Sequence, residues 1–311
     1  MRVVFLGTTE FAKTILEYLY DQKVEIKAVV TRPDKPKGRS NKPSPSAVKV
    51  FAEAKGLPLY QPVKASEISF CEFLKTLQAD FFIVAAFGEI LKEHFLQIPK
   101  YASLNVHGSV LPKYRGAAPV ARAIMEGEKE TGVTIVKMNV QLDAGEILAI
   151  RKTPIPLEMT AGELMGVLAD LGKTALLKVM QQFEKNALTM IAQNPQEVSY
   201  AKKLTLEDAK VDWSRSSLAV HNQIRGVTPH PGAWCWIEIK GEKKRLLIKK
   251  TLPHSERGLA GEILSKKPLE LIVGCGQDSL SILEVQLEGK KSMPIDLFLR
   301  GTPLSALKFV S

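Results

Sequence analysis

The sequence predicts an α/β protein in two parts, a doubly wound, mainly parallel sheet followed by a small C-terminal β-barrel. Up to about residue 150, short apolar runs alternate with amphipathic helical stretches, which is the order of βα units with helices on both faces of the sheet. From about residue 187, short alternating strands separated by glycine turns replace that order. At 311 residues the chain is long enough for two domains, which we place at 1–188 and 207–311, with a linker at 189–206.

The first unit of the pattern is a strand over Val3–Leu6 and a helix over Phe11–Tyr20, which Thr8 or Thr9 can cap. This opening is Rossmann-like. Gly7 is its only glycine, however, so the glycine fingerprint of dinucleotide-binding proteins is missing. A nicotinamide- or flavin-dependent oxidoreductase is therefore the least favoured of the alternatives.

A strand over Ile26–Thr31 leads into a long loop at 32–45 that contains four prolines. Between Thr31 and Val50 there are six basic residues and one acidic residue. A loop of this length inside a compact domain is either functional or a solvated insertion. In the functional interpretation it is a basic arm that orders on a phosphate backbone.

The same reasoning gives the remaining elements of the first domain. Because parallel strands end at the same edge of a sheet, the loops after Leu6, Ala86 and Val106 are expected to meet there. The predicted elements are helices at Ser46–Lys55 and Ile68–Leu77, strands at Leu57–Tyr60 and Phe81–Ala86, and two helical stretches within Leu157–Phe183.

A strand that begins at Ser103 places Asn105 and His107 side by side, because side chains alternate along an extended backbone. The strand ends at Gly108, where a polar loop begins, and a helix resumes near Ala118. An amide can donate to an oxyanion, and an imidazole moves protons near neutral pH. On spacing alone, the pair is more typical of a hydrogen-bonded structural pair at a strand end.

A second strand, Thr134–Met138, shifts the interpretation of Asn105 and His107 from a structural pair to a catalytic one, because it leads into a glycine-containing turn that carries Asp143. An aspartate on a loop that leaves a neighbouring strand can reach His107 and fix its tautomer and orientation. The sequence therefore predicts an acid–base site of three side chains, Asn105, His107 and Asp143.

The second domain begins with a helix at Leu218–Ile224, and its predicted strands suit a barrel of the oligonucleotide-binding (OB-like) type. Basic side chains on these strands fit a nucleic-acid face or a solvated barrel edge equally well. The strands are 234–239, 245–249, 261–264, 269–273 and 280–285, and the basic residues are Lys243, Lys244, Arg245, Lys249 and Lys250.

The net charge of +10 and the isoelectric point near 9.3 suit a polyanionic partner, although a basic protein without such a partner has the same values. Cys71, Cys235 and Cys275 are far apart and lack metal-ligand spacing, which is typical of reduced packing thiols in a cytoplasmic protein without a bound metal. No apolar run is long enough to cross a membrane.

Several of these stretches together resemble the folate-dependent formyltransferases, over essentially the whole chain. The basic insertion and the basic second domain resemble the tRNA-acting members of that family. Two positions depart from the family pattern, Val110 where Leu is usual and Ala144 where Thr is common. The matching stretches are Gly7–Ala12, the basic loop, Ala86–Leu91, Asn105–Pro119, Glu130–Thr134, Leu142–Gly145 and Val211–Trp213.

The resemblance implies a fold of the formyltransferase type with a catalytic first domain and a tRNA-binding second domain. It implies transfer of the formyl group of 10-formyltetrahydrofolate to the amino group of methionyl initiator tRNA, by a monomer, for translation initiation. It assigns catalysis to Asn105, His107 and Asp143. The implied folate contacts are Phe87, Gly88, Ile90, Leu91, Ser109, Val110, Leu111, Pro112 and Leu142, and the implied tRNA contacts are Lys35, Lys37, Arg39, Lys42, Lys202 and Lys203.

Two alternatives remain open from the residues. A formyltransferase that acts on a small amine, such as a purine precursor or an aminosugar, would need neither the basic arm nor the basic barrel. A tRNA-binding protein could keep the fold without the activity, although the intact set of three side chains argues against it.

Overall fold

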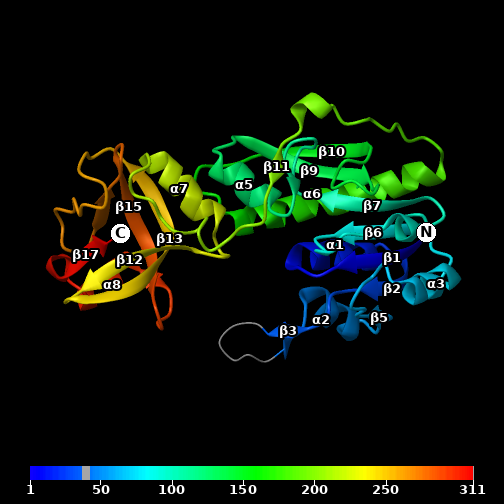
Figure 1. Ribbon diagram of the computed structural model, residues 1–311, viewed down its shortest axis with the longest axis horizontal. Coiled ribbons are helices and arrows are strands. Elements are labelled where there is room, and N and C mark those ends of the chain that lie inside the picture. Colours follow the sequence, from blue (N-terminus) through cyan, green and yellow to red (C-terminus); the bar gives the residue numbers. More distant parts are fainter. Residues whose placement is uncertain (37–42, 311) are drawn as a thin grey trace. The chain divides into compact units, whose positions relative to one another are not determined.

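A computed structural model describes residues 1–36 and 43–310 and divides the chain into two compact units (Figure 1). Two internal segments of the N-terminal half belong to the second unit, so the chain passes between the units more than once. The first unit is Met1–Pro119, Glu130–Thr153 and Met165–Ala201, and the second is Val120–Lys129, Pro154–Leu164 and Lys202–Ser311.

The core of the first unit is a seven-stranded sheet in the order β10-β9-β7-β6-β1-β2-β5 (Figure 1). The pairs β1–β2, β1–β6, β2–β5 and β6–β7 are parallel, whereas β7 and β9 are antiparallel. The predicted mainly parallel sheet is therefore confirmed. The strands are β1 (Arg2–Gly7), β2 (Glu25–Val30), β5 (Leu59–Tyr60), β6 (Phe81–Ala85), β7 (Ala102–His107), β9 (Glu130–Lys137) and β10 (Ile147–Pro154).

Helices cover both faces of this sheet, as a doubly wound fold requires. Leu74 and Phe95, from α3 and α4, pack with Leu6 and Phe82 on one face, and Phe183 of α6 packs edge-on against Phe81 of β6, 5.6 Å between ring centroids. The helices of the first unit are α1 (Glu10–Asp21), α2 (Ala47–Ala54), α3 (Ile68–Thr76), α4 (Glu93–Leu96) and most of α6 (Ala161–Glu184), whereas α5 (Pro119–Met125) lies almost entirely in the second unit.

Helix α6 corrects one expectation, because a single helix of 24 residues replaces the two predicted stretches. Gly172, in the middle of this helix, serves close packing. A Cβ at Gly172 would lie 2.8 Å from the Val106 side chain, so the missing side chain lets the helix approach β7 closely.

The second unit contains an antiparallel sheet that curls into a half-barrel. Its strand order is β14-β15-β13-β12-β17, and β16 is paired to β15. Residues 261–264, predicted as a strand, make only an isolated bridge from Ile263 to Val273, and the C-terminal strand β17 was missed. The elements are α7 (Ser217–Gly226), β12 (Ala233–Ile239), β13 (Glu242–His254), β14 (Leu271–Gly274), β15 (Ser279–Leu287), β16 (Met293–Pro294), α8 (Ile295–Gly301) and β17 (Leu307–Val310).

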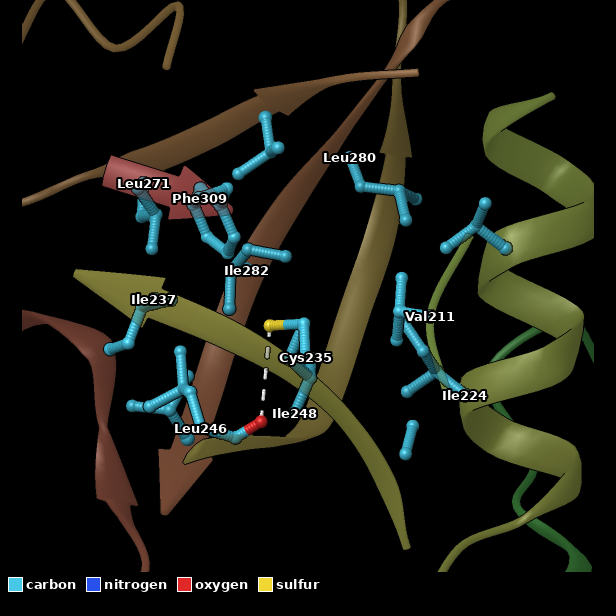
Figure 2. Packing of buried hydrophobic residues seen from close by; sticks show 14 of the residues in the cluster. Val211, Ile224, Cys235, Ile237, Leu246, Ile248, Leu271, Leu280, Ile282 and Phe309 are labelled. Carbon is cyan, nitrogen blue, oxygen red and sulfur yellow. Dashed lines mark hydrogen bonds between the residues drawn. The ribbon is translucent and has the colours of Figure 1, made fainter. Parts of the chain in front are cut away.

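Figure 2 shows the core of this half-barrel, where alternate residues of β12 point inward. Cys235 lies among them, with its Sγ 3.9 Å from the Leu246 carbonyl oxygen, and burial raises the pKa of its thiol. Cys71 and Cys275 are also buried and unpaired, as expected for packing thiols. None of the helices that the structure describes has the length and apolar character needed to cross a membrane.

An ion pair inside the second unit allows a prediction about stability. Asp208 accepts hydrogen bonds from Arg122 Nη1 at 2.8 Å and from the Thr205 backbone N–H at 2.8 Å. The Arg122 guanidinium is the main reason that the pKa of the Asp208 carboxyl falls from 3.8 to about 2. Because the pKa is lower in the folded state, the pair stabilises fully above pH ~4, and its contribution is lost as the pH falls toward 2.

We expect Asp208→Asn to lower the free energy of unfolding of the second unit by about 2 kcal/mol at pH 7. The difference from the unsubstituted protein should shrink as urea titrations move from pH 7 to pH 3. Glu270→Gln is the matched control, because its pair with Lys267 is largely exposed and should contribute under about 0.5 kcal/mol. A difference independent of pH would contradict the ion-pair explanation.

Candidate active site

The site begins on β7, which lies between parallel β6 and antiparallel β9. Asn105 is paired with Val84 on one side and Val136 on the other, and His107 is paired with Thr134. The predicted alternation holds, since both side chains leave the same face of the strand. His107 is buried with 5% of its surface exposed, whereas Asn105 is half-buried.

Asp143 reaches this pair because the loop after β9 turns back toward β7. The loop is tightly packed at Gly145, where a Cβ would lie 1.7 Å from the Lys137 carbonyl oxygen, so only glycine fits there. Asp143 itself has a φ of +48°, a left-handed conformation that aspartate tolerates better than most residues.

The carboxylate of Asp143 brings the three predicted side chains together. Its Oδ1 accepts a hydrogen bond from Asn105 Nδ2 at 3.2 Å, and its Oδ2 lies 3.6 Å from His107 Nδ1. The backbone N–H of Gly116 donates to Oδ2 at 2.8 Å, which fixes the carboxylate from a third side. An amide, an imidazole and a carboxylate thus converge from β7 and the loop after β9.

The His107 ring contacts a backbone group that the sequence did not indicate. His107 Nε2 lies 2.9 Å from the backbone carbonyl oxygen of Tyr114. Since a carbonyl can only accept, Nε2 carries a proton, and neutral His107 keeps its lone pair on Nδ1 beside Asp143. The expectation that Asp143 fixes the tautomer and orientation of His107 stays a prediction: the Tyr114 carbonyl accepts from Nε2, and Asp143 lies beside Nδ1, the nitrogen that can exchange a proton.

The Ser109–Pro112 segment is held by hydrogen bonds of the buried side chains of Ser109 and Thr134. Ser109 is fully buried, and its hydroxyl donates to the Lys113 carbonyl at 2.6 Å. Thr134, which sequence analysis did not single out, donates to the Ser109 carbonyl at 2.6 Å and accepts from the Leu111 N–H at 3.1 Å. Leu111 and Pro112 are also buried, so Val110 presents the accessible side chain of this segment.

The other expected folate contacts divide into two groups. Phe87 and Leu91 pack into the core beneath the sheet edge. Gly88 is exposed with a φ of +76°, and the apolar side chains of Ile90 and Leu142 are 82% and 56% exposed. Exposed apolar side chains on loops are available to a flat ligand, whereas the buried pair shapes the loop.

The expected tRNA contacts are only partly described, because Lys37, Arg39 and Lys42 lie outside residues 1–36 and 43–310. Lys35 is exposed on β3 (Lys35–Pro36), which pairs with β4 (Pro43–Ser44) at the base of the basic loop. Lys202 and Lys203 are exposed in the second unit.

One of the six basic residues counted around the basic loop has a different function. Lys49 Nζ pairs with Asp34 Oδ2 at 2.7 Å, and this pair lowers the pKa of Asp34 and raises that of Lys49. Gln61 donates to Asp34 Oδ1 at 2.8 Å, so these contacts anchor the base of the loop. Within the part of the chain that the structure describes, no group of His, Cys, Asp and Glu side chains could hold a metal ion.

Comparisons with known proteins identify the class to which this fold and site belong. The sequence pattern of the formyl transferase family matches residues 1–180, and that of the formyl transferase C-terminal domain matches residues 203–303. The chain therefore belongs to the formyl transferase family.

Its relatives narrow this to the methionyl-tRNA formyltransferases. The chain is 45% identical over 312 residues to the methionyl-tRNA formyltransferase of Protochlamydia amoebophila, with 100% of this chain and 98% of the relative covered. It is 42% identical over 314 residues to that of Chlamydia pneumoniae, with the same coverage of both chains.

Solved structures share the fold at lower identity. The sugar 3N-formyltransferase WlaRD, solved with dTDP and 5-N-formyl-THF, is 20% identical with a TM-score of 0.67, over 94% of this chain and 99% of that one. HypX of Aquifex aeolicus, solved with tetrahydrofolic acid, is 18% identical with a TM-score of 0.66, over 96% of this chain and 47% of that one.

Proposed function

We propose that this chain transfers the formyl group of 10-formyltetrahydrofolate to the α-amino group of methionyl initiator tRNA. The product, N-formylmethionyl-tRNA, then serves translation initiation in the cytoplasm, where aminoacylated tRNA is used. The observation that carries the proposal is the convergence of Asn105, His107 and Asp143 in a chain 40–45% identical to methionyl-tRNA formyltransferases over nearly full length.

The nucleophile is the amine, which must be neutral to attack the formyl carbon. As the new C–N bond forms, the nitrogen becomes acidic, and Nδ1 of His107 accepts its proton. The resulting imidazolium has Nε2–H on the Tyr114 carbonyl and Nδ1–H facing the Asp143 carboxylate, so both protons are directed to acceptors. Asp143 thereby stabilises the charge that appears on His107.

The attack also places negative charge on the formyl oxygen. The Asn105 amide nitrogen has two N–H groups, of which one is bound to Asp143; among the described residues the second has no acceptor and is available to that oxygen. When the intermediate collapses, the bond from the formyl carbon to N10 of the folate breaks, and the proton held by His107 passes to N10. No covalent bond to the enzyme is needed.

The donor would lie on the loops that end at the same sheet edge. Ile90 and Leu142 offer apolar surface to the pterin ring, Gly88 permits close approach, and Val110 is the accessible side chain of the 109–112 segment. Phe87, Leu91, Ser109, Leu111 and Pro112 support these contacts from beneath. We propose 1–188 as the catalytic domain, 189–206 as the linker and 207–311 as the tRNA-binding domain of a monomer. The compact units differ from these bounds, because 120–129 and 154–164 group with the second unit and 189–201 with the first.

Lys202 and Lys203 are expected to bind tRNA phosphates. Replacing both with alanine should weaken binding of methionyl-tRNA by roughly 10-fold and reduce the slope of log affinity against log salt by about 1–2 units, because fewer counterions are released. Turnover at saturating tRNA should change by less than about twofold, since neither lysine takes part in the chemistry. Filter binding across a salt series measures the first effect, and initial rates measure the second.

Lys290 and Lys291 form the matched control, because they are also adjacent and exposed in the second unit. Replacing both with alanine should leave the affinity and the salt slope close to those of the unsubstituted protein. Equal effects of the two double substitutions would show that only net charge matters and would contradict a site at Lys202 and Lys203.

The proposed function is tested by following a labelled formyl group from 10-formyltetrahydrofolate. The protein is incubated with methionyl initiator tRNA, methionyl elongator tRNA, uncharged tRNA and a panel of small amines that includes an aminosugar nucleotide. We expect label on the amino group of methionyl initiator tRNA. Label on a small amine instead would favour the small-molecule alternative, and no transfer at all would favour a protein that binds tRNA without activity.

A further inference from the structure

Gln193 occupies a central position behind the active site, although its sequence context does not mark it as functional. It lies in the first unit, just before the short 3-10 helix η1 (Pro195–Glu197), and it is half-buried. Its Nε2 donates to two backbone carbonyl oxygens, those of Asp143 and Gly145, both at 2.8 Å. Its Oε1 accepts two hydrogen bonds from Arg115, from Nε at 3.0 Å and from Nη2 at 2.7 Å.

The two carbonyls that Gln193 binds flank Ala144, so the amide holds the peptide groups next to the catalytic carboxylate. Apart from the close packing at Gly145, this stretch of the loop has few other contacts. Leu142 and Gln141 are exposed, and the Ala144 N–H makes only a long hydrogen bond of 3.4 Å to Gln141. Asp143 is also left-handed, a conformation that persists where surrounding contacts impose it.

Through Arg115, the same side chain is also connected to the segment that holds the Asp143 carboxylate. Arg115 lies on β8 (Arg115–Gly116), which pairs with β11 (Tyr200–Ala201). The next residue, Gly116, donates its N–H to Asp143 Oδ2. Contacts therefore form a closed ring: Gln193 holds the backbone of Asp143 and the side chain of Arg115, while the backbone beside Arg115 holds the carboxylate.

We propose that Gln193 is a positioning residue for formyl transfer, which fixes the Asp143 carboxylate against His107 Nδ1 by holding the loop on either side of Ala144 and the Arg115 segment at once. The inference rests on the proposed function. Gln193 does not touch the reacting atoms, and it acts only through Asp143. Its effect should therefore appear in the chemical step and not in the binding of either substrate.

Replacing Gln193 with alanine should lower kcat by about 10- to 100-fold, because a displacement of roughly 1 Å at a catalytic group can cost about 10²-fold. KM for the folate and for the tRNA should change by less than about threefold. Gln193→Glu separates the two halves of the contact, since a carboxylate still accepts from Arg115 but cannot donate to the two carbonyls. We expect it to lose at least as much kcat as Gln193→Ala.

The control is Gln196→Ala, an exposed glutamine on the same segment, which should keep kcat within about twofold. Thermal unfolding of all three variants shows whether a loss of kcat accompanies a loss of structure. A fall in kcat for Gln193→Glu with an unchanged melting temperature would support positioning.

A double-substitution cycle gives the decisive readout. If Gln193 acts through Asp143, adding Gln193→Ala to Asp143→Ala should slow single-turnover transfer by less than about twofold further. A full 10-fold or greater additional loss would overturn the inference, and so would a Gln193→Ala protein with unaltered kcat. The unsubstituted protein is assayed alongside. If it transfers no formyl group to methionyl-tRNA, the proposed function fails. If it does transfer the formyl group and the Gln193 variants transfer it equally fast, this inference fails and the proposed function stands.

Discussion

Replacing Asn105 with alanine should lower kcat by ~10²–10³-fold, because one preorganised donor to a developing oxyanion is typically worth about 3–4 kcal/mol. The Asn105 amide is half-buried, is fixed through one N–H by Asp143, and can direct its other N–H to the formyl oxygen. Affinity for 10-formyltetrahydrofolate should change by less than about threefold, since the charge that Asn105 stabilises appears only in the transition state. Steady-state rates and equilibrium binding of the donor measure the two quantities.

Asn105→Asp is the matched comparison, because aspartate keeps the size of the side chain but removes both donor groups and adds a negative charge next to Asp143. Its loss of kcat should equal or exceed that of Asn105→Ala. If Asn105→Ala kept near-normal turnover, Asn105 would be a structural strand-end residue, as its spacing alone suggested.

Replacing His107 with alanine should lower kcat by about 10²–10⁴-fold, the range expected when a general base is lost. His107 is 5% exposed; its Nε2 is held by the Tyr114 carbonyl, and its Nδ1 lies 3.6 Å from Asp143 Oδ2. The deficit should be evident in single-turnover transfer at saturating concentrations of both substrates.

His107→Gln is the informative partner variant, since glutamine can still donate a hydrogen bond but cannot take up a proton near neutral pH. It should be impaired to within about tenfold of His107→Ala. Recovery of most of the activity in His107→Gln would mean that hydrogen bonding alone, and not proton transfer, is the function of this position.

The sequence predicted the parts of the site that depend on side-chain alternation. Asn105 and His107 share a face because a strand has a period of two, and Asp143 was placed within reach because it follows a neighbouring strand. The contacts that determine the proton positions were beyond this reasoning. The Tyr114 carbonyl and the Gly116 N–H are backbone groups, which every residue has, so no residue type indicates them.

Long-range side-chain contacts were missed for a related reason. Gln193 lies 50 residues from Asp143 in a stretch that reads as a linker, and only the fold brings the two together. The basic loop shows the opposite error, because counting charges included Lys49, which is paired with Asp34 at the base of the loop. Charge counts show where basic residues occur but not which of them are already paired.

Fold prediction likewise succeeded for local patterns and failed for features that depend on contacts between distant parts of the sequence. The parallel sheet was predicted well because each βα unit is a local pattern, whereas β17 was missed because its pairing with β12 joins residues about 70 positions apart. Helix α6 was divided in error into two stretches, and the close approach of Gly172 to Val106 of β7, which is visible only in the fold, shows how the continuous helix packs.

The central claim is that one amide, one imidazole and one carboxylate jointly transfer a formyl group to methionyl-tRNA. Its most direct test is the single-turnover rate of label transfer from 10-formyltetrahydrofolate to methionyl initiator tRNA, measured side by side for the unsubstituted protein, Asn105→Ala and His107→Ala. We predict rapid transfer by the unsubstituted protein and rates at least about 10²-fold lower for both variants. Transfer by either variant at close to the unsubstituted rate would contradict the account.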